Sequence, residues 1–372
     1  MPRPSVLASS VALVLVACGG GDTAALPRDR DDRGAEAAVA PSAAIDATLP
    51  LVRDTLRAAV VTERVPRDSD DPAIWVDPVD PARSLILGTD KGDRDGGVYA
   101  FRLDGTIDRA RSVAPLARMN NVDVRQGVRT SEGGTIDVAV ATERGRMALR
   151  VFALPAMRPI DGGGIPVFGS DSSRAPMGVA LYRRARDGAL FAIVGGKGGP
   201  ATDYLEQYRL TLAGGRATAR LVRRFGAFSG TKEIEAIVAD DATGMVFYSD
   251  ETVGVRRYHA DPDSGSRELA LFATRGVVGD HEGLAIRATS DTTGYLLLSD
   301  QQGRRLHVYR REAPHALVAV IPVDARETDG IEVSSAALGP RFPAGVLVMM
   351  SDTRRFHVYD WRDVERLMAS RR

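Results

Sequence analysis

The chain has 372 residues, and its 49 Lys and Arg residues balance its 49 Asp and Glu residues. This balance argues against a nucleic-acid partner, which would require a basic excess, while 44% apolar and 26% charged residues are usual for a globular protein with a sizeable core. The single cysteine excludes an internal disulfide framework and any cysteine-based zinc site.

Residues 1–18 are typical of an export signal. Arg3 precedes an apolar run, residues 6–17, that is too short to span a bilayer. The run ends in LVACG, which resembles the lipidation box of bacterial lipoproteins, where the cysteine, here Cys18, is lipidated and becomes the mature N-terminus; an ordinary signal peptide is the alternative. We therefore expect an exported protein, lipid-anchored at the cell envelope, or otherwise periplasmic or secreted. Residues 19–48 are rich in Gly, Ala, Asp, Arg and Pro, which predicts a flexible tether.

From residue 49 to residue 372 one pattern recurs six times. It consists of a short apolar strand, a polar loop and a second strand that often ends in Tyr or Phe. The copies start 51, 54, 55, 50 and 51 residues apart. A β-rich repeat of this period predicts an all-β fold, a six-bladed β-propeller, over residues 49–372. The copies begin at Leu85, Ile136, Leu190, Met245, Tyr295 and Val346.

A second series of short strands precedes the first. Each of these strands has a polar or small residue in its first two positions, and the two series alternate without exception. Each blade should therefore hold an inner strand followed by a hairpin. Helical signals are weak apart from a short stretch at residues 363–370. The inner strands begin at Asp71, Asn120, Met177, Ile234, His281 and Asp329.

Equivalent positions in the repeats lie at equivalent heights around a propeller, so the starts of the inner strands should gather at one end of the central channel. Taken singly, each polar residue there could be a turn residue or a solvated side chain, but their recurrence favours a site. An oxygen-only cluster of carboxylates suits Ca²⁺, and facing cations suit an anionic, metal-chelating substrate such as a phosphate ester. The strand starts bring Asp71, Asn120, Asn121, Glu235, Asp280, Glu282 and Asp329, and the hairpin loops bring Lys91, Arg144, Lys197 and Glu251.

Other catalytic chemistry has little support. The chain contains no His-Glu-x-x-His, no Gly-x-Ser-x-Gly and no phosphate-binding P-loop. His307 and His357 occupy equivalent repeat positions, which predicts that both lie on a strand surface. His281 lies between Asp280 and Glu282, and on a strand it would point away from both.

Two acidic segments are predicted as turns and are left out of the site. Asp240 and Asp241 precede Thr243-Gly244, which is typical of a hairpin turn. Residues 261–265 are similar to the start of a calcium loop, but Phe272 occupies the twelfth position, where such a loop needs a glutamate.

Six short motifs occur in a fixed order between residues 70 and 331. This ordered set resembles the β-propeller phytases, the calcium-dependent alkaline phytases of bacteria. The resemblance implies a six-bladed propeller that hydrolyses the phosphomonoesters of phytate, myo-inositol hexakisphosphate, with several Ca²⁺ ions as cofactors. The motifs are DDPAIWVDP from Asp70, NNVDVR from Asn120, Glu235 with ADD at 239–241, DHEGL from Asp280, GYLL from Gly294 and DGI from Asp329.

The resemblance also assigns roles to residues. Calcium would neutralise phosphate charge and lower the pKa of a water that attacks phosphorus, so that no protein nucleophile is needed. Glu235, Asp71, Lys91 and Arg144 would carry catalysis, on free phytate or its calcium complex, in a monomer. The implied calcium ligands are Asp71, Glu235, Glu251, Asp280, Glu282 and Asp329, the implied phosphate-binding cations are Lys91, Arg144 and Lys197, and Asn120 and Asp123 match a motif whose metal role is left open.

Three positions depart from the family pattern, Met177, the single lysine at Lys91 where some members have two, and Ala236 in place of a glycine, and Met177 keeps the first of two alternative functions open. Met177 stands where the family has a tyrosine in the calcium site, and because a thioether is a poor Ca²⁺ ligand we expect weaker binding of one ion. The first alternative is a propeller that binds calcium and phosphorylated ligands without hydrolysis. The second is a calcium-dependent lactonase or phosphotriesterase, whose uncharged pocket disagrees with Lys91, Arg144 and Lys197. A turnover assay separates hydrolysis from binding alone.

Overall fold

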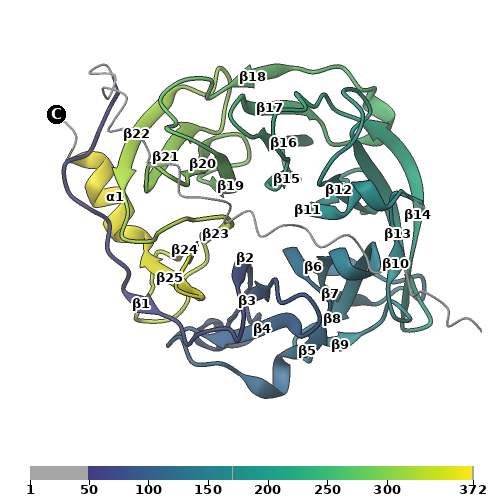
Figure 1. Cartoon of the computed structure of the whole chain (residues 1–372). Coiled ribbons are helices and arrows are strands. Elements are labelled where there is room, and N and C mark those ends of the chain that lie inside the picture. The colour runs from purple at the N-terminus through teal and green to yellow at the C-terminus, as the bar shows by residue number, and fades with distance from the viewer. Residues whose placement is uncertain (1–48, 170, 371–372) are drawn as a thin grey trace, which may run out of the picture. The chain divides into compact units, whose positions relative to one another are not determined.

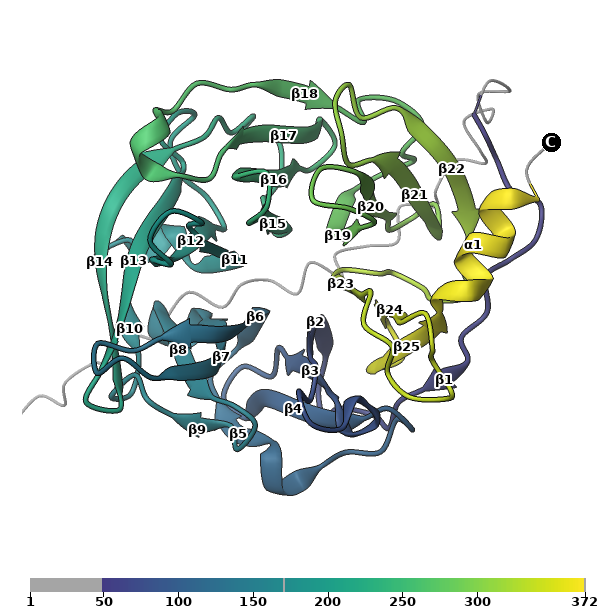
Figure 2. The ribbon, with the colours of Figure 1, turned by 180° about the vertical axis from the view of Figure 1, so that it is seen from behind.

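The computed structural model describes residues 49–169 and 171–370. The predicted signal segment, the lipidation site at Cys18 and the tether up to residue 48 lie outside these residues. Six antiparallel sheets stand around a central axis in Figure 1, and Figure 2 shows the same ring from behind. The described chain is therefore an all-β, six-bladed propeller, as the repeats predict. Among the described helices, none is both long and apolar enough to cross a membrane.

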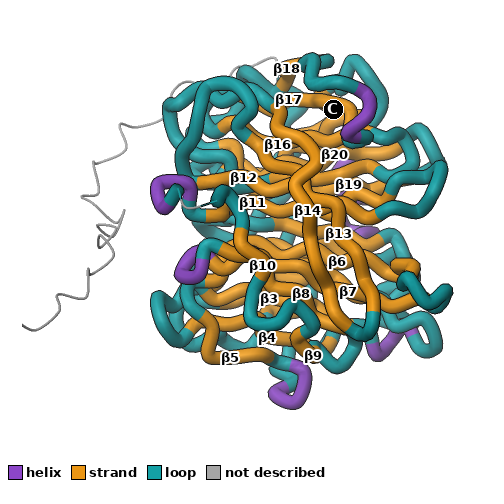
Figure 3. The backbone as a smooth tube through the Cα atoms, turned by 90° about the vertical axis from the view of Figure 1, so that its right-hand side faces the viewer, coloured by secondary structure: helices purple, strands orange, loops and turns teal. Residues whose placement is uncertain are grey.

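Each blade is a sheet whose strands follow one another from the axis outward, and Figure 3 shows the blades from the side, with loops at both rims. The innermost strands are β2 (Ser69–Trp75), β6 (Met119–Arg129), β11 (Pro176–Arg183), β15 (Ile237–Asp240), β19 (His281–Ala288) and β23 (Ile331–Ser334). The second strands are β3 (Leu85–Asp90), β7 (Thr135–Glu143), β12 (Leu190–Gly196), β16 (Met245–Asp250), β20 (Gly294–Asp300) and β24 (Val346–Ser351). The third strands are β4 (Gly96–Arg102), β8 (Ala148–Ala153), β13 (Leu205–Ala213), β17 (Gly254–His259), β21 (Arg305–Arg310) and β25 (Arg355–Asp360). The outermost strands are β5 (Val113–Leu116), β9 (Arg158–Pro159) with β10 (Ile165–Pro166), β14 (Arg216–Phe225), β18 (Ala270–Phe272), β22 (Leu317–Pro322) and β1 (Val60–Val61).

The ring is closed by a strand from the far end of the sequence. β1 pairs antiparallel with β25, with Val60 opposite Val358 and Val61 opposite His357. The sixth blade therefore combines an early and a late segment of the chain, and main-chain hydrogen bonds hold the two together. The repeat pattern does not reveal this closure, because β1 has only two residues.

Clusters of buried apolar side chains lie between neighbouring blades and join them around the ring. In β3, Leu85 and Leu87 face the cluster shared with the second blade, and Ile86 faces the cluster shared with the sixth. Because both faces of a blade are buried, such a strand reads as a continuous apolar run. Gly88 is needed beside them, since a Cβ there would lie 2.2 Å from the ring of Phe356.

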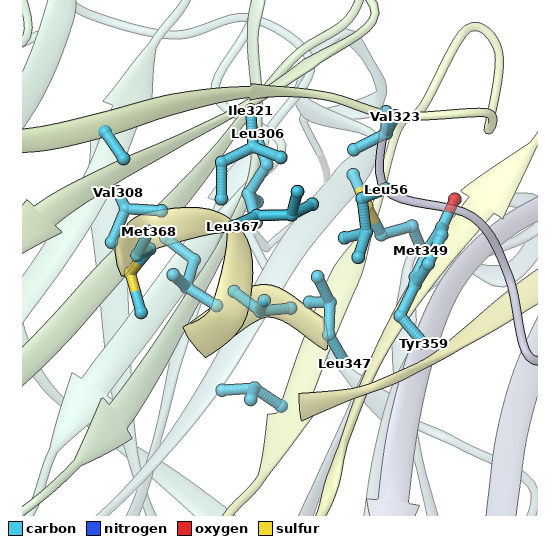
Figure 4. Packing of buried hydrophobic residues seen from close by; sticks show 14 of the residues in the cluster. Leu56, Leu306, Val308, Ile321, Val323, Leu347, Met349, Tyr359, Leu367 and Met368 are labelled. Atoms are coloured by element: carbon cyan, nitrogen blue, oxygen red, sulfur yellow. The ribbon is translucent and has the colours of Figure 1, made fainter. Parts of the chain in front are cut away.

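A short helix covers the junction of the fifth and sixth blades. α1 (Trp361–Ala369) confirms the helix predicted at residues 363–370 and begins two residues earlier. In Figure 4, Leu367 of this helix packs in the cluster that contains Leu306 of β21 and Leu56, which precedes β1. The helix therefore shields strands that the propeller would otherwise expose.

The prediction of two strand-surface histidines is wrong. His307 is fully buried, with its Nε2 3.3 Å from Oδ2 of Asp300. The His357 side chain is 12% exposed, and its Nδ1 lies 3.1 Å from Oδ1 of Asp324. The sequence pattern identifies three strands a blade, and both histidines lie on the third strand, which pairs with a fourth strand and so is not the edge of its sheet.

Both acidic turns are confirmed as structural elements. β15 ends in a turn in which Gly244 donates to the carbonyl of Asp240 at 2.8 Å. The Asp240 carboxylate also accepts two hydrogen bonds from the buried guanidinium of Arg311, at 2.7 and 2.5 Å. Residues 261–265 contain a single 3-10 turn, Pro262–Ser264.

Candidate metal and phosphate site

The inner strands of four blades begin with the same irregularity. In β2, Ser69 pairs with Asp90 but Pro72 pairs with Gly88, so the inner strand carries one extra residue. β6, β11 and β19 show the same one-residue shift at the equivalent place. Such bulges interrupt the alternation of side chains and redirect them. They explain how consecutive polar residues at the strand starts can contact different partners around the axis.

Three carboxylates gather between the fourth and fifth blades. Glu251 follows β16, Asp280 precedes β19 and Glu282 lies in the bulge of β19; all three are buried, and each offers an oxygen within 4.8 Å of the other two. This is the one such group of metal-ligating side chains within residues 49–169 and 171–370. Oε2 of Glu282 is buried and has no hydrogen-bond partner among the described residues. A set of oxygen donors with unused bonding capacity fits a hard cation such as Ca²⁺.

A second charged group surrounds Lys91, which follows β3. Its Nζ lies 2.8 Å from Oδ2 of Asp329 and 3.0 Å from Oδ1 of Asp70. The other oxygens of these carboxylates are also held, because Gln301 donates to Asp329 at 2.6 Å and Asn120 donates to Asp70 at 2.7 Å. Lys91 is thus fixed between two blades that meet where the ring closes.

The remaining predicted cations lie on the neighbouring blades. Arg144 follows β7, is buried, and donates to Oδ1 of Asn120 at 3.2 Å, which connects it to the Lys91 group. Lys197 follows β12, with its Nζ 3.2 Å from Oε1 of Glu233. The three cations that the sequence predicts therefore each contact polar groups at this end of the inner strands.

Glu235 joins the two charged groups electrostatically. Burial raises its pKa to about 7, Lys91 opposes this rise, and Asp329 adds to it. Its charge in turn raises the pKa values of Glu251 and Glu282. Glu235 therefore lies within electrostatic reach of both the three-carboxylate cluster and the Lys91 group.

The three-carboxylate cluster is short of positive charge. Burial, followed by repulsion from Glu235 and Asp280, raises the pKa of Glu251 to about 9. Burial and the neighbouring carboxylates also raise the pKa of Glu282 well above its usual value. Lys232 contacts the cluster, with its Nζ 2.6 Å from Oδ2 of Asp280 and 3.5 Å from Oε2 of Glu251. The single charge of this ammonium does not balance three carboxylates, and a divalent cation would bring the cluster closer to neutrality.

Asp71 lies apart from the three-carboxylate cluster. Its Oδ2 accepts a hydrogen bond from the backbone of Val122 on the next blade, at 2.9 Å. Burial raises its pKa well above the usual value, and the carboxylates that add to the rise are Asp70, Glu332 and Asp123. Of the two neighbouring aspartates it is Asp70 that meets Lys91, because the bulge of β2 directs the pair to different places.

Several residues of the site were not predicted. Asp70 belongs to a motif that the sequence analysis singled out, and its contact with Lys91 depends on a bulge that no sequence signal marks. Gln301 and Gln302 follow β20 in one of the predicted repeats; Gln302 donates to Asp280 at 2.7 Å, and its own oxygen accepts from the Asp280 backbone. Lys232 occupies no recurring position, so nothing in the repeat pattern could have identified it.

Met177, which stands where the family has a tyrosine in the calcium site, is buried. Met177 lies at the start of β11, 1% exposed, and its carbonyl accepts a hydrogen bond from Oγ1 of Thr142 at 2.7 Å. The weaker binding of one calcium ion remains a prediction.

Comparison with known proteins identifies the family. A model of the family described as phytase matches residues 37–356. The chain belongs to the phytase family. A 3-phytase of Bacillus subtilis (strain 168) is 31% identical to it over 296 residues, which cover 75% of this chain and 73% of the relative. The chain is thus a phytase, an enzyme that releases phosphate from phytate, and membership favours hydrolysis over the two alternatives.

Solved structures of distant sequence share the fold. A luciferin-regenerating enzyme superposes with a TM-score of 0.51 at 14% identity and covers 81% of this chain and 94% of its own. A calcium-binding protein, regucalcin, from Agrobacterium tumefaciens str. C58 gives a TM-score of 0.51 at 11% identity, with 82% and 96% covered. At these identities the likeness supports the propeller fold alone.

Proposed function

We propose that this phytase depends on calcium and that its active site combines the three-carboxylate cluster with the cations Lys91, Arg144 and Lys197. The observation that carries the proposal is the set of buried oxygens of Glu251, Asp280 and Glu282, all within 4.8 Å of one another, with Oε2 of Glu282 lacking a hydrogen-bond partner among the described residues. We propose several calcium ions, with Glu235, Asp329 and Asp71 as further ligands, and Asp71, which lies apart from this cluster, would belong to a separate ion. Bound there, Ca²⁺ would neutralise phosphate charge and lower the pKa of a water.

The chain's own cations would bind and orient the substrate. Lys91 and Arg144 are joined through Asp70 and Asn120, so a phosphate group that contacts both would be held by a rigid pair of donors. Their hydrogen bonds would stabilise the charge that builds on the phosphate oxygens as the ester bond breaks. Lys197 lies with Glu233 on the next blades and would take a further oxygen.

Glu235 would act where the two charged groups meet. With a pKa of about 7, it is a carboxylate in alkaline solution and becomes protonated as the pH falls. In the metal-free enzyme it is then an anionic ligand mainly above about pH 7, and a bound divalent cation would extend that range to lower pH. Replacement by glutamine keeps its shape and removes its charge.

The test is phosphate release from phytate by protein lacking residues 1–18, with added Ca²⁺ or with excess chelator. We expect release with Ca²⁺ only, and loss of at least a hundredfold in kcat for Glu235→Gln with an unchanged fold by circular dichroism. Asp291→Asn, which removes one charge from an exposed loop, is the matched control and should behave as wild type. Release that survives chelation, or an active Glu235→Gln enzyme, would refute the calcium site.

We also propose that the enzyme is exported and anchored at the cell envelope through lipidated Cys18, and that it acts as a monomer on phytate or its calcium complex. The LVACG sequence supports the anchor. A single chain carries all the residues of the proposed site, which supports the monomer.

A further inference from the structure

Lys232 contacts the three-carboxylate cluster, but neither the repeat pattern nor the family resemblance assigns it a role. The ammonium of Lys232 contacts Oδ2 of Asp280 at 2.6 Å and lies 3.5 Å from Oε2 of Glu251. These are two of the three carboxylates that approach one another within 4.8 Å. Lys232 therefore already provides positive charge where the proposed function places a metal ion.

The segment that carries Lys232 is held at both sides of the lysine. Before it, Ser229 donates two hydrogen bonds to Asp250, at 3.0 and 2.7 Å; after it, Ile234 is fully buried. Between these anchors, Gly230 has a φ of +74° and open space around its α-carbon. The Lys232 side chain is 45% exposed, so it can leave the carboxylates for solvent while its backbone stays beside them.

All the lysines of the chain lie at the end of the channel that carries the candidate site. Of the 49 Lys and Arg residues, three are lysines, and all the others are arginines. Each of the three lysines makes an ion pair with carboxylates of the site described above: Lys91 with Asp70 and Asp329, Lys197 with Glu233, and Lys232 with Asp280 and Glu251. An ammonium is a compact, strongly hydrated point charge on a flexible stem, whereas a guanidinium grips a carboxylate with a rigid fork. Lysine is therefore better suited than arginine to separate from its carboxylates when a metal ion binds them.

An ammonium and a divalent cation cannot share the same oxygens. Both would lie within a few ångströms of Asp280 Oδ2, and two positive charges at that separation repel strongly where little water intervenes. A metal ion that binds Glu251, Asp280 and Glu282 must therefore displace the Lys232 ammonium. The loop anchors keep the displaced ammonium near the rim of the cluster, where an anionic substrate oxygen would meet it.

We propose that Lys232 is an exchangeable counter-ion of the metal site, offsetting part of the cluster's negative charge in the metal-free enzyme and giving way to Ca²⁺ on binding. This inference rests on the proposed calcium site. The exchange sets the calcium affinity, because each ion must compete with a cation tethered to the protein. The ammonium also reduces the electrostatic repulsion among the carboxylates of the metal-free enzyme.

The test measures Ca²⁺ binding by titration calorimetry, and the thermal midpoint in chelator and in saturating Ca²⁺, for Lys232→Met and Lys232→Arg. For Lys232→Met we expect the calcium dissociation constant to fall about tenfold, within the usual range of coupling between two ligands. Its midpoint should fall in chelator and equal that of wild type in saturating Ca²⁺. Lys232→Arg should bind Ca²⁺ more weakly than wild type, because the larger, bidentate cation is harder to displace. Arg366→Met, which breaks an exposed ion pair with Asp363 on α1, is the matched control and should change neither the affinity nor the difference between the two midpoints.

The outcomes separate this inference from the proposed function. If wild type binds Ca²⁺ but Lys232→Met binds it with the same or lower affinity, the exchange is refuted and the calcium site stands. A midpoint that falls equally in chelator and in Ca²⁺ would show a purely structural lysine and would also refute it. If wild type itself binds no Ca²⁺, the proposed calcium site and the exchange are both refuted.

Discussion

The crowding of Glu251, Asp280 and Glu282 makes a quantitative prediction for the metal-free enzyme. Two unit charges 4.8 Å apart repel by about 3 kcal/mol at an effective dielectric constant of about 20. Glu282→Gln removes its repulsion with both neighbours, and Lys232 already offsets part of that repulsion. We therefore expect the variant to be more stable than wild type by about 2–4 kcal/mol in excess chelator at pH 9, because each carboxylate of the cluster is then either ionised beside its neighbours or kept protonated at a cost in free energy.

The pH dependence has a definite sign. Burial, followed by the neighbouring carboxylates, raises the pKa of Glu251 in the folded state to about 9, from a usual value of 4.5. The folded protein then binds more protons than the unfolded chain over this interval, so the stability of the metal-free enzyme falls as the pH rises from about 4.5 to about 9. In Glu282→Gln the fall should be smaller, because one source of the raised pKa is gone.

The assay is thermal unfolding followed by circular dichroism, in chelator and in saturating Ca²⁺, between pH 5 and pH 9. A propeller of this size has an unfolding entropy of roughly 0.7 kcal/mol/K, so 2–4 kcal/mol corresponds to a rise in the midpoint of about 3–6 °C. In Ca²⁺ the order should reverse, because wild type keeps a ligand that the variant lacks. Asp291→Asn removes the same charge from an exposed loop and should leave the midpoint unchanged. A Glu282→Gln midpoint equal to or below that of wild type at pH 9 in chelator would refute the crowding argument.

Three further changes probe the fold and the anchor. Asp240→Ala leaves the buried guanidinium of Arg311 without its bidentate partner. The free energy of unfolding, measured in urea, should fall by about 3–5 kcal/mol, and kcat at saturating Ca²⁺ should not change. A large loss of kcat would instead place Asp240 in the active site. Leu367→Ala should cost about 2–5 kcal/mol, because it opens a cavity in the cluster beneath α1, and a cost below 1 kcal/mol would show that the helix does not stabilise the ring. Cys18→Ser should abolish incorporation of labelled fatty acid into the expressed protein, and labelling that persists would refute the anchor.

The architecture could be predicted from the sequence because it depends on local pattern. The repeat from Leu85 to Val346 shows the number of blades, since each copy forms a hairpin whose strands are apolar on both faces. The outer strands do not appear in the repeat pattern, because their lengths range from two residues in Val60–Val61 to ten in Arg216–Phe225, and Val60–Val61 also pairs with a strand far along the chain. The burial of His307 beside Asp300 depends on packing inside the fold, which the repeat pattern does not show.

The candidate site also has one part that the repeats predict and one part that depends on local backbone geometry. Glu251, Asp280 and Glu282 come from two blades and were predicted together, because equivalent positions of a repeat meet at one end of the axis. The partner of Lys91 on the first blade is Asp70, because a bulge in β2 turns the two aspartates of one motif to different neighbours.

The fold class, the number of blades and the end of the channel where carboxylates and cations meet could be predicted before folding is considered, because they follow from periodicity and residue type. Which oxygen faces which cation, and which lysine contacts the three-carboxylate cluster, can be read only from the folded chain. Those contacts depend on single-residue bulges and on loops without a repeat, such as the one that carries Lys232, where a shift of one residue changes the partner.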